Sequence, residues 1–268
     1  EEVKKITGEK QVNTIGYCIA GTTLHLTLSL MKKRGDTSVK SATFFTTLTD
    51  FGDQGEFTPF LQDDFIGGLE KEVDDNGVLR SFILGRTMSF LRSNDLVYTP
   101  AIKSYMMGEA PPAFDLLFWN GDGSNLPAKM AKQYLRGLCR ENKFVGDGFE
   151  MFGETLHIRD VDLPICSIGC DTDHIAPWRA CYLGFQQTGS KDRTFIMSGS
   201  GHIAGIINPP VKKKYGYFTN ADTSGTPQEW LEGAKQHEGS WWPQWEKWIG
   251  KRSGKMVPAR EPGDSTHP

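Results

Sequence analysis

The feature that most constrains this chain is the hexapeptide Gly16-Tyr17-Cys18-Ile19-Ala20-Gly21. The apolar run from Val12 to Gly16 before it indicates a buried parallel strand, and the pattern from Ile19 to Arg34 after it predicts a helix. A nucleophile between small residues at a strand-to-helix junction is typical of a nucleophile elbow, in which a strained turn exposes the reactive side chain. The order of strand, sharp turn and helix therefore predicts an α/β protein with a reactive cysteine.

The turn would also place the backbone N–H of Ile19 at a helix N-terminus, where the dipole favours a thiolate and a developing oxyanion. We therefore expect Cys18 to be the nucleophile and the Ile19 N–H to be an oxyanion donor. The pattern G-x-C-x-A is equally compatible with a buried structural cysteine beside a tight turn. The assignment therefore depends on partners elsewhere in the chain.

Two residues occupy the positions that an α/β-hydrolase fold gives to its acid and its base, in the order nucleophile, acid, base. Asp173 follows a strand-like run that ends near Cys170, and His202 follows another that ends near Ser198. We expect Asp173 to be the acid and His202 the base. An ordinary loop carboxylate and a turn histidine remain the alternative, and spacing alone does not separate Asp173 from Asp171.

Other polar candidates fit a catalytic role less well. The side chain of His174 would diverge from that of the adjacent Asp173, and His25 lies about two helical turns beyond Cys18, so both are expected to be packing residues. The run Lys212-Lys213-Lys214 could hold phosphates of an anionic substrate, but a solvated basic turn is the favoured interpretation. Cys166 and Cys170 lack a matching pair at zinc-binding spacing, so no metal and no cofactor is predicted.

Further strands are expected at Ser41–Leu48, Asp162–Gly169 and Arg193–Ser198, and helical segments broken at Gly239 and Pro243 are expected over Thr226–Ile249. More than 110 residues separate the first two of these strands, far more than a crossover needs. The sequence therefore predicts a mostly parallel sheet interrupted by a cap or lid subdomain. The expected division is core at 1–50, cap at 51–152, core at 153–250 and a tail at 251–268. Glycines at 52, 55, 67 and 68 are candidate hinges of the cap.

Composition narrows the possible partners. With 30 Lys and Arg against 33 Asp and Glu, the formal net charge is −3, which argues against nucleic acid as a partner. No apolar run approaches the length of a transmembrane helix, and the first residues lack a signal-peptide core. Five cysteines without framework spacing favour reduced thiols, so a cytoplasmic location is expected.

Several longer motifs resemble those of the polyhydroxyalkanoate synthases, enzymes that polymerise 3-hydroxyacyl-coenzyme A into polyester. The resemblance covers about Val12 to Gly250 and rests on six stretches: the elbow through Thr22, Phe90 to Val97, Phe114 to Asp122 with Asn125-Leu126-Pro127, Asp173 to Trp178, Ser200 to Gly205 through Asn208-Pro209-Pro210, and Gly239 to Pro243. The Asn-Gly-Asp in the third stretch is similar to the short-chain class.

This resemblance implies an acyltransferase in which Cys18 accepts the acyl group, His202 is the base and Asp173 is its acidic partner. It implies the acyl-coenzyme A substrate and the growing polyester as partners, a homodimer, and association with polyester granules. Two alternatives stay open: a cysteine hydrolase of the thioesterase or dienelactone-hydrolase type, and an inactive granule-associated fragment.

The sequence departs from the family pattern at two points. Only 17 residues precede Cys18, whereas several strands and an oxyanion loop precede the elbow in an α/β-hydrolase, so the fold is expected to lack its N-terminal strands. Ala20 stands where the family usually has glycine, and its methyl group could narrow the space beside the nucleophile.

Overall fold

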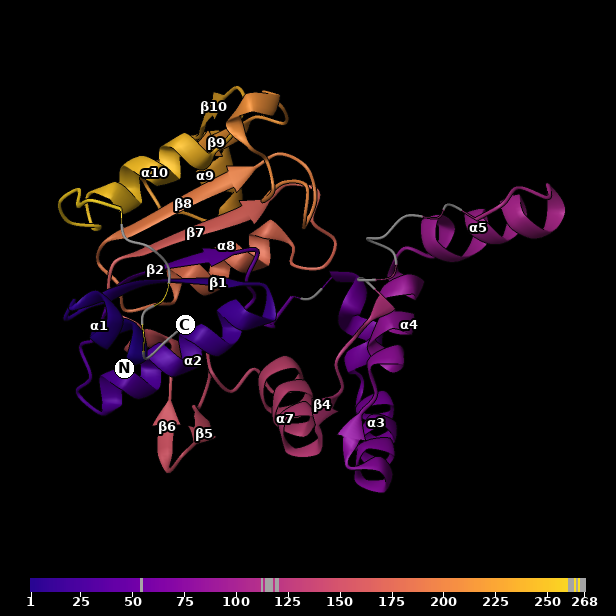
Figure 1. The fold of residues 1–268 in the computed structure, drawn as a ribbon. Helices are drawn as coiled ribbons and strands as arrows, with labels where there is room; N and C mark the ends of the chain where they lie inside the picture. The colour runs from indigo at the N-terminus through magenta and orange to yellow at the C-terminus, as the bar shows by residue number, and fades with distance from the viewer. Residues whose placement is uncertain are drawn as a thin grey trace.

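A computed structural model describes residues 1–53, 55–111, 113, 118, 121–259, 263 and 265. Its centre is a six-stranded sheet in the order β1-β2-β7-β8-β9-β10 (Figure 1). The first four strands are parallel: β1 (Val12–Tyr17), β2 (Val39–Phe45), β7 (Ile165–Cys170) and β8 (Arg193–Ser198). The last two, β9 (Tyr217–Thr219) and β10 (Lys235–His237), are antiparallel. The predicted mostly parallel sheet of an α/β-hydrolase fold is confirmed.

Strand β7 explains why two of the cysteines are structural. Its six residues are all buried, and alternate side chains enter different core clusters. Ile165 packs with α2 (Ile19–Lys33), α8 (Trp178–Gln186) and α9 (Pro227–Glu232). Cys166 and Cys170 pack on the other face, against α10 (Trp242–Gly250). The sheet is therefore covered on both faces.

Several elements end where the sequence pattern did not predict. Strand β2 stops at Phe45 and not at Leu48, because Thr46 adopts a left-handed backbone with φ 43°. Strand β7 begins at Ile165 and not at Asp162, and the short strand β10 replaces part of the expected helical region. Pro243 does not break a helix but occupies the first turn of α10, where its missing N–H costs no hydrogen bond.

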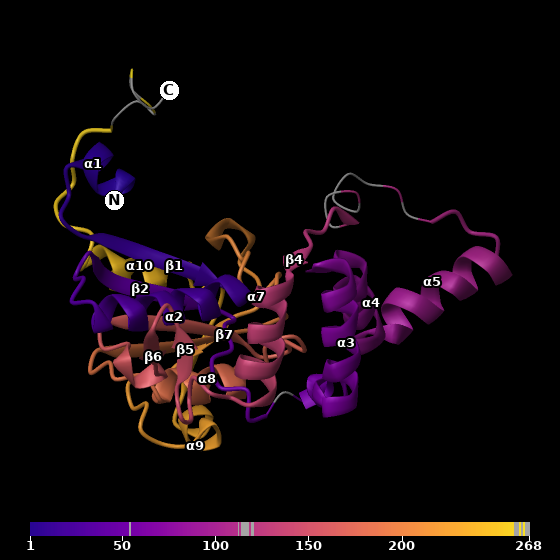
Figure 2. The same ribbon diagram turned by 90° about the horizontal axis from the view of Figure 1, so that it is seen from below.

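The described residues between 51 and 152 leave the sheet and form a mainly helical layer beside it, from which the segment labelled α5 projects away (Figures 1 and 2). Its first half contains the 3₁₀ segment η1 (Gly55–Leu61), α3 (Asp63–Asn76), β3 (Val78–Leu79) and α4 (Ser81–Leu91). The π-helical turns η2 (Asn94–Tyr98) and η3 (Ile102–Met106) follow, separated by α5 (Thr99–Ala101). The second half contains β4 (Leu126–Pro127), α7 (Ala128–Lys132) and the π-helical η4 (Gln133–Arg140). Gly67 and Gly68 lie inside α3 and not at a hinge.

The two halves of this layer are joined to each other and to the core. Strands β3 and β4 pair antiparallel, and Arg136 of η4 forms a two-pronged ion pair with Glu70 of α3. A cluster around Ile66 and Leu138 reaches Leu26 of α2. It also includes the hairpin β5 (Phe149–Met151) and β6 (Glu154–Leu156), which spans the expected boundary at residue 152. Most of the motif from Phe114 to Asp122 lies outside the described residues.

The remaining elements are short. The helix α1 (Glu2–Thr7) precedes the sheet, the 3₁₀ turn η5 (Ile158–Asp160) precedes β7, and the 3₁₀ turn η6 (Pro210–Lys212) follows the loop after β8. Among the described residues, no helix is long and apolar enough to cross a membrane.

Candidate active site

Cys18 occupies a strained turn between β1 and α2. Its backbone has φ 52° and ψ −126°, a conformation that a non-glycine residue rarely adopts. Hydrogen bonds on both sides hold it: the Cys18 N–H donates to Phe45 O at 2.9 Å, and the Gly21 N–H donates to Cys18 O at 2.9 Å. The next residue, Ile19, begins α2, so its N–H has no acceptor within the helix. The geometry is that of a nucleophile elbow.

Two glycines make this turn possible. A Cβ on Gly16 would lie 2.6 Å from Gly21 Cα, and a Cβ on Gly21 would lie 1.9 Å from Thr47 Oγ1. Neither neighbour has room to move far, because the first is backbone and Thr47 is buried. Ala20 is exposed, so its methyl group is not pressed against packed neighbours. The close approach therefore requires glycine at positions 16 and 21.

His202 and Asp173 meet at the carboxyl ends of β8 and β7. The Nδ1 atom of His202 lies 2.7 Å from Asp173 Oδ2, and the His202 ring also makes a side-chain hydrogen bond with Cys18. Since Nδ1 faces the carboxylate, Nε2 is the nitrogen left for the thiol. The structure thus brings together the three side chains predicted as nucleophile, base and acid, in that spatial order.

The surroundings of Asp173 fix its orientation. Its Oδ1 atom accepts the N–H groups of Ile175 and Ala176 at 2.8 and 2.9 Å, while Oδ2 faces His202. The Asp173 side chain is fully shielded from solvent. Asp171 points elsewhere: it is exposed, and its carboxylate accepts backbone hydrogen bonds from Thr172 and Ser200. The structure therefore pairs His202 with Asp173 and not with Asp171.

Aromatic side chains hold the loop that carries His202. The Nε1 groups of Trp241 and Trp242 donate to Gly205 O and Ile206 O at 2.8 and 2.9 Å. The hydroxyl of Tyr17, the residue before the nucleophile, donates to His202 O at 2.8 Å. Trp241 and Trp242, which belong to the motif from Gly239 to Pro243, therefore position His202 by holding the loop that carries it.

The electrostatics of the site favour a charged imidazole. Burial is the largest influence on His202 and lowers its pKa, but the hydrogen bonds with Asp173 and Cys18 and the charges of both outweigh burial and raise the pKa to about 9. His202 is therefore protonated at neutral pH. An imidazolium beside Cys18 is the partner that stabilises a thiolate.

A cavity of about 300 Å³ opens at Cys18 and runs between the sheet and the helical layer. On the core side it is lined by Ile19, Thr22 and Thr46, and on the other side by apolar residues of η1, α3 and α4 such as Phe57, Phe65 and Ile83. A mostly apolar cavity with a reactive group in its wall is suited to an acyl chain.

The other predicted candidates lie away from this chemistry. His25 is buried and stacks on Phe44 with ring centroids 3.6 Å apart, and burial lowers its pKa to about 4. The lysines at 212–214 lie on an exposed turn. Cys139 lines the same cavity as Cys18, but burial raises the pKa of its thiol to about 12. Burial also raises the pKa values of Cys166, Cys170 and Cys181.

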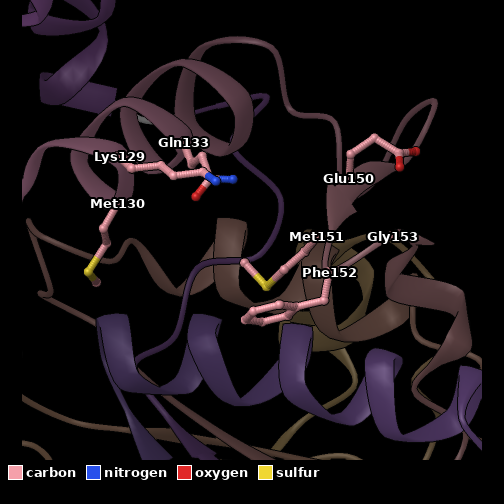
Figure 3. A pocket seen from close by; sticks show the side chains of 7 residues that line it. All are labelled: Lys129, Met130, Gln133, Glu150, Met151, Phe152 and Gly153. Atoms are coloured by element: carbon pink, nitrogen blue, oxygen red, sulfur yellow. The ribbon is translucent and has the colours of Figure 1, made fainter.

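A second hollow, of about 390 Å³, lies between α7 and the β5–β6 hairpin (Figure 3). Lys129, Met130 and Gln133 line one wall, and Glu150 and Phe152 line the other. Its lining includes none of the three residues at the elbow site. Among the described residues, no three side chains of His, Cys, Asp or Glu gather in a way that could hold a metal ion.

Sequence reasoning missed the polar residues that surround the elbow site. Tyr17 supports the His202 loop, and Thr46 and Tyr134 line the cavity. Tyr17 adjoins the nucleophile, which was a usable signal. Thr46 and Tyr134 come from other elements, and their distance from Cys18 in sequence hides them.

Comparison with known proteins identifies close relatives. The chain is 39% identical over 261 residues to the poly(3-hydroxyalkanoate) polymerase subunit PhaC of Rhizobium meliloti, covering 97% of this chain and 43% of the relative. It is 37% identical over 260 residues to the PhaC subunit of Cupriavidus necator, covering 95% of this chain and 44% of the relative. The chain is a homologue of the poly(3-hydroxyalkanoate) polymerases. It spans less than half the length of these polymerases, and no family model matches it.

Solved structures with similar folds include a monoacylglycerol lipase of Paleococcus ferrophilus and an esterase of Exiguobacterium antarcticum. The first has 16% identity and a TM-score of 0.42, covering 75% of this chain and 63% of the lipase. The second has 11% identity and a TM-score of 0.39, covering 76% of this chain and 64% of the esterase.

Proposed function

We propose that this chain carries the reaction centre of a polyhydroxyalkanoate synthase, an acyltransferase that polymerises (R)-3-hydroxyacyl-coenzyme A and releases coenzyme A. The observation that carries the proposal is the Cys18–His202–Asp173 arrangement beside an apolar cavity, in a chain homologous to poly(3-hydroxyalkanoate) polymerases.

In the first step the Cys18 thiolate attacks the thioester carbonyl of the substrate. The carbonyl oxygen becomes an oxyanion, and the Ile19 N–H at the start of α2 is the donor we assign to it. The carbon–sulfur bond to coenzyme A then breaks, and the imidazolium of His202 protonates the departing thiolate. The product is an acyl group on Cys18. Because one thioester replaces another, the exchange involves little change in energy.

Chain growth requires an ester bond. His202, now neutral, takes the proton of a 3-hydroxyl group, the resulting oxygen nucleophile attacks an acyl thioester, and a thiolate leaves. Asp173 has its Oδ1 filled by two N–H groups and its Oδ2 by His202. We therefore propose that Asp173 orients the imidazole of His202 and stabilises its positive charge. In this proposal Asp173 does not contact the 3-hydroxyl group.

The layer formed by residues 51–152 is proposed as a cap, because its apolar side chains form one wall of the cavity at Cys18. Water in this cavity would hydrolyse the acyl-enzyme, so a cap that excludes water favours polymer over free acid. The short-chain class is proposed from the Asn-Gly-Asp sequence at 120–122, and a homodimer and attachment to polyester granules are proposed from the resemblance to the family.

The test is covalent labelling of the intact protein with radiolabelled 3-hydroxybutyryl-coenzyme A. We expect acyl label and insoluble polymer in the unaltered protein, and neither in Cys18→Ala. Changing Cys139, Cys166, Cys170 or Cys181 to Ala should leave acylation measurable, because each of these thiols is buried and has a raised pKa.

Other outcomes would replace the proposal. Label on one of the four buried cysteines in the Cys18→Ala protein would refute the choice of nucleophile. Free 3-hydroxybutyrate without polymer would indicate a cysteine hydrolase, and the absence of any acylation would indicate an inactive protein.

A further inference from the structure

The cavity at Cys18 extends from the core into the helical layer, past two clusters of apolar side chains. The first cluster contains Leu26 of α2 together with Leu61, which lines the cavity. Tyr134 packs against this cluster, and burial followed by the charges of Cys139 and Cys18 raises the pKa of its phenol. The part of the cavity beside the first cluster is therefore the part nearest Cys18.

The second cluster lies farther from the core. It contains Leu79 of β3 with Leu84 of α4 and Leu126 of β4, and among the described residues it includes none from the six-stranded sheet or from α2. Figures 1 and 2 accordingly show α4 on the far side of α7 from the sheet. No residue of α4 is fully buried, and Leu84 is one of those that line the cavity. The far end of the cavity is therefore at α4.

The polar side chains that line this cavity already have hydrogen-bond partners. Two threonines donate to backbone carbonyls: Thr22 to Leu48 O at 2.6 Å, and Thr87 to Ile83 O at 3.0 Å. The other hydroxyls pair with side chains: Thr46 with the Tyr17 phenol, and Tyr134 with the Cys139 thiol. Burying an ester carbonyl without a donor is unfavourable, whereas burying an alkyl chain is favourable. Away from Cys18, the described part of the cavity therefore suits hydrocarbon better than a run of ester groups.

The volume of the cavity indicates how long that hydrocarbon can be. The volume is about 300 Å³. A molecule of liquid water takes up about 30 Å³, and a carbon or oxygen atom of an acyl group is of similar size, so the cavity has room for about ten such atoms. A 3-hydroxybutyryl group has six non-hydrogen atoms, whereas a 3-hydroxyoctanoyl group has ten. The shorter group would therefore leave the far end of the cavity empty.

We propose that this cavity takes the alkyl side chain on C3 of the acyl group and extends the substrates beyond 3-hydroxybutyryl thioesters to those of medium length, up to about 3-hydroxyoctanoyl; this inference rests on the proposed function. Cys18 lies in the cavity wall, so an acyl group on its sulfur places the side chain on C3 inside the cavity. Leu84 at the far end then limits the length of that side chain.

The chemistry of the acyl group agrees with this arrangement. The side chain on C3 is purely hydrocarbon, and each of its methylene groups that moves from water into an apolar cavity favours binding. The oxygen on C3 carries the rest of the polyester during growth, and it points away from the apolar end. The Asn-Gly-Asp sequence at 120–122 favours short chains, and these also fit the cavity, but its volume allows longer ones.

The experiment measures the second-order rate constant of Cys18 acylation by mass spectrometry of the intact protein, with 3-hydroxybutyryl-coenzyme A and with 3-hydroxyoctanoyl-coenzyme A. In the unaltered protein we expect the 3-hydroxyoctanoyl thioester to react at least as efficiently as the 3-hydroxybutyryl thioester. A lower rate constant with the longer substrate would overturn the inference, and this comparison requires no variant.

A variant at the far end tests where the side chain lies. Leu84→Trp fills that end, and we expect it to slow acylation by the 3-hydroxyoctanoyl thioester at least tenfold. The rate with the 3-hydroxybutyryl thioester should stay within about twofold, because the shorter group does not reach α4. Phe82→Trp is the matched control, since it enlarges an exposed side chain of the same helix that does not line the cavity. It should leave both rates within about twofold.

The possible outcomes separate this inference from the polymerase proposal. Equal slowing of both substrates by a folded Leu84→Trp protein, or no effect on either, would refute the assignment of the side chain to this cavity. Normal acylation with loss of polymer growth would show that the cavity holds polyester instead. In each of these cases acylation of Cys18 in the unaltered protein keeps the polymerase proposal intact. If neither thioester acylates Cys18 in the unaltered protein, the polymerase proposal fails and this inference fails with it.

Discussion

The charge state of His202 follows from two side chains that approach it from different strands. Asp173 and Cys18 both form hydrogen bonds with the ring, and their combined effect exceeds that of burial. An imidazole with a raised pKa is protonated in the resting site, so it can donate to the first leaving group without prior proton uptake. The carboxylate therefore acts on the reaction through the imidazole.

Asp173→Asn should lower the pKa of His202, because it removes the charge and the strong acceptor at Nδ1. In the unaltered protein the pKa is raised from 6.5 to about 9, so this interaction stabilises the fold fully below pH 6.5 and is lost as the pH rises through 9. We expect the loss of unfolding free energy in Asp173→Asn to be on the order of a few kcal/mol below pH 6.5 and to shrink towards pH 9.

The measurements are imidazole titration by NMR and urea unfolding at several pH values. Asp171→Asn is the matched control, because Asp171 is exposed and has no bond to His202. An unchanged His202 titration in Asp173→Asn would contradict the role of the carboxylate.

At this scale the sequence predicted the charged and nucleophilic residues but not the hydroxyls. Cys18, Asp173 and His202 each follow a strand, and the carboxyl ends of parallel strands meet at one edge, so chain order indicated these three positions. Chain order did not separate Asp173 from Asp171, and only the family resemblance favoured Asp173. Thr46 and Tyr134 line the cavity beside Cys18 only because separate elements pack together, and that packing leaves no local pattern in the sequence.

Among the elements, the turn from β1 to α2 restricts the amino-acid sequence most, because the backbone at Gly16 lies close to the backbone at Gly21. Its strand and helix were predictable from apolar periodicity and from the basic residues that end α2. The ends of other strands were not. Strand β2 ends early because Thr46 turns the chain, and β10, with the residues Lys235, Gln236 and His237, has no apolar alternation to reveal it.

Substituting glycines by alanine at two places should have opposite effects on stability. Gly16→Ala places a methyl group 2.6 Å from Gly21 Cα, and we expect it to destabilise the fold by about 3 kcal/mol. Gly68→Ala lies in mid-helix with nothing within 4 Å of the added carbon, and should stabilise by about 0.5–1 kcal/mol.

Denaturant unfolding of both variants checks this pair, and covalent acylation separates stability from chemistry. Gly16→Ala should lose acylation even at temperatures where it remains folded, because the elbow no longer presents Cys18. Normal acylation in a folded Gly16→Ala protein would show that the close approach of positions 16 and 21 is not required.

For the whole molecule, the main question is how substrate reaches Cys18. One wall of the cavity belongs to the sheet and the other to the layer of residues 51–152. The two ends of that layer are tied together: the Phe51 N–H donates to Asn142 Oδ1 at 3.0 Å, and Asn142 Nδ2 donates to Asp50 Oδ1 at 2.8 Å. Gln187 of the core also donates to Asp50. The Ile158 N–H also donates to Phe144 O at 2.9 Å, and Arg34 donates to Phe152 O at 3.3 Å. These polar contacts hold the layer to the core near residues 142–152, so the helices of residues 55–91 can tilt about that end without unfolding.

We therefore expect the proposed cap to move during substrate binding. Hydrogen exchange of the intact protein should slow over residues 55–91 when a non-hydrolysable 3-hydroxyacyl-coenzyme A analogue is bound, because the ligand would bridge the two walls of the cavity. Strand β7, which is buried on both faces, serves as the internal reference and should not change. Asn142→Ala should raise exchange in the same residues without ligand, since it frees the anchored ends. Equal exchange over residues 55–91 with and without the analogue, at saturating concentration, would mean that this layer is a rigid part of the core and that substrate enters without its movement.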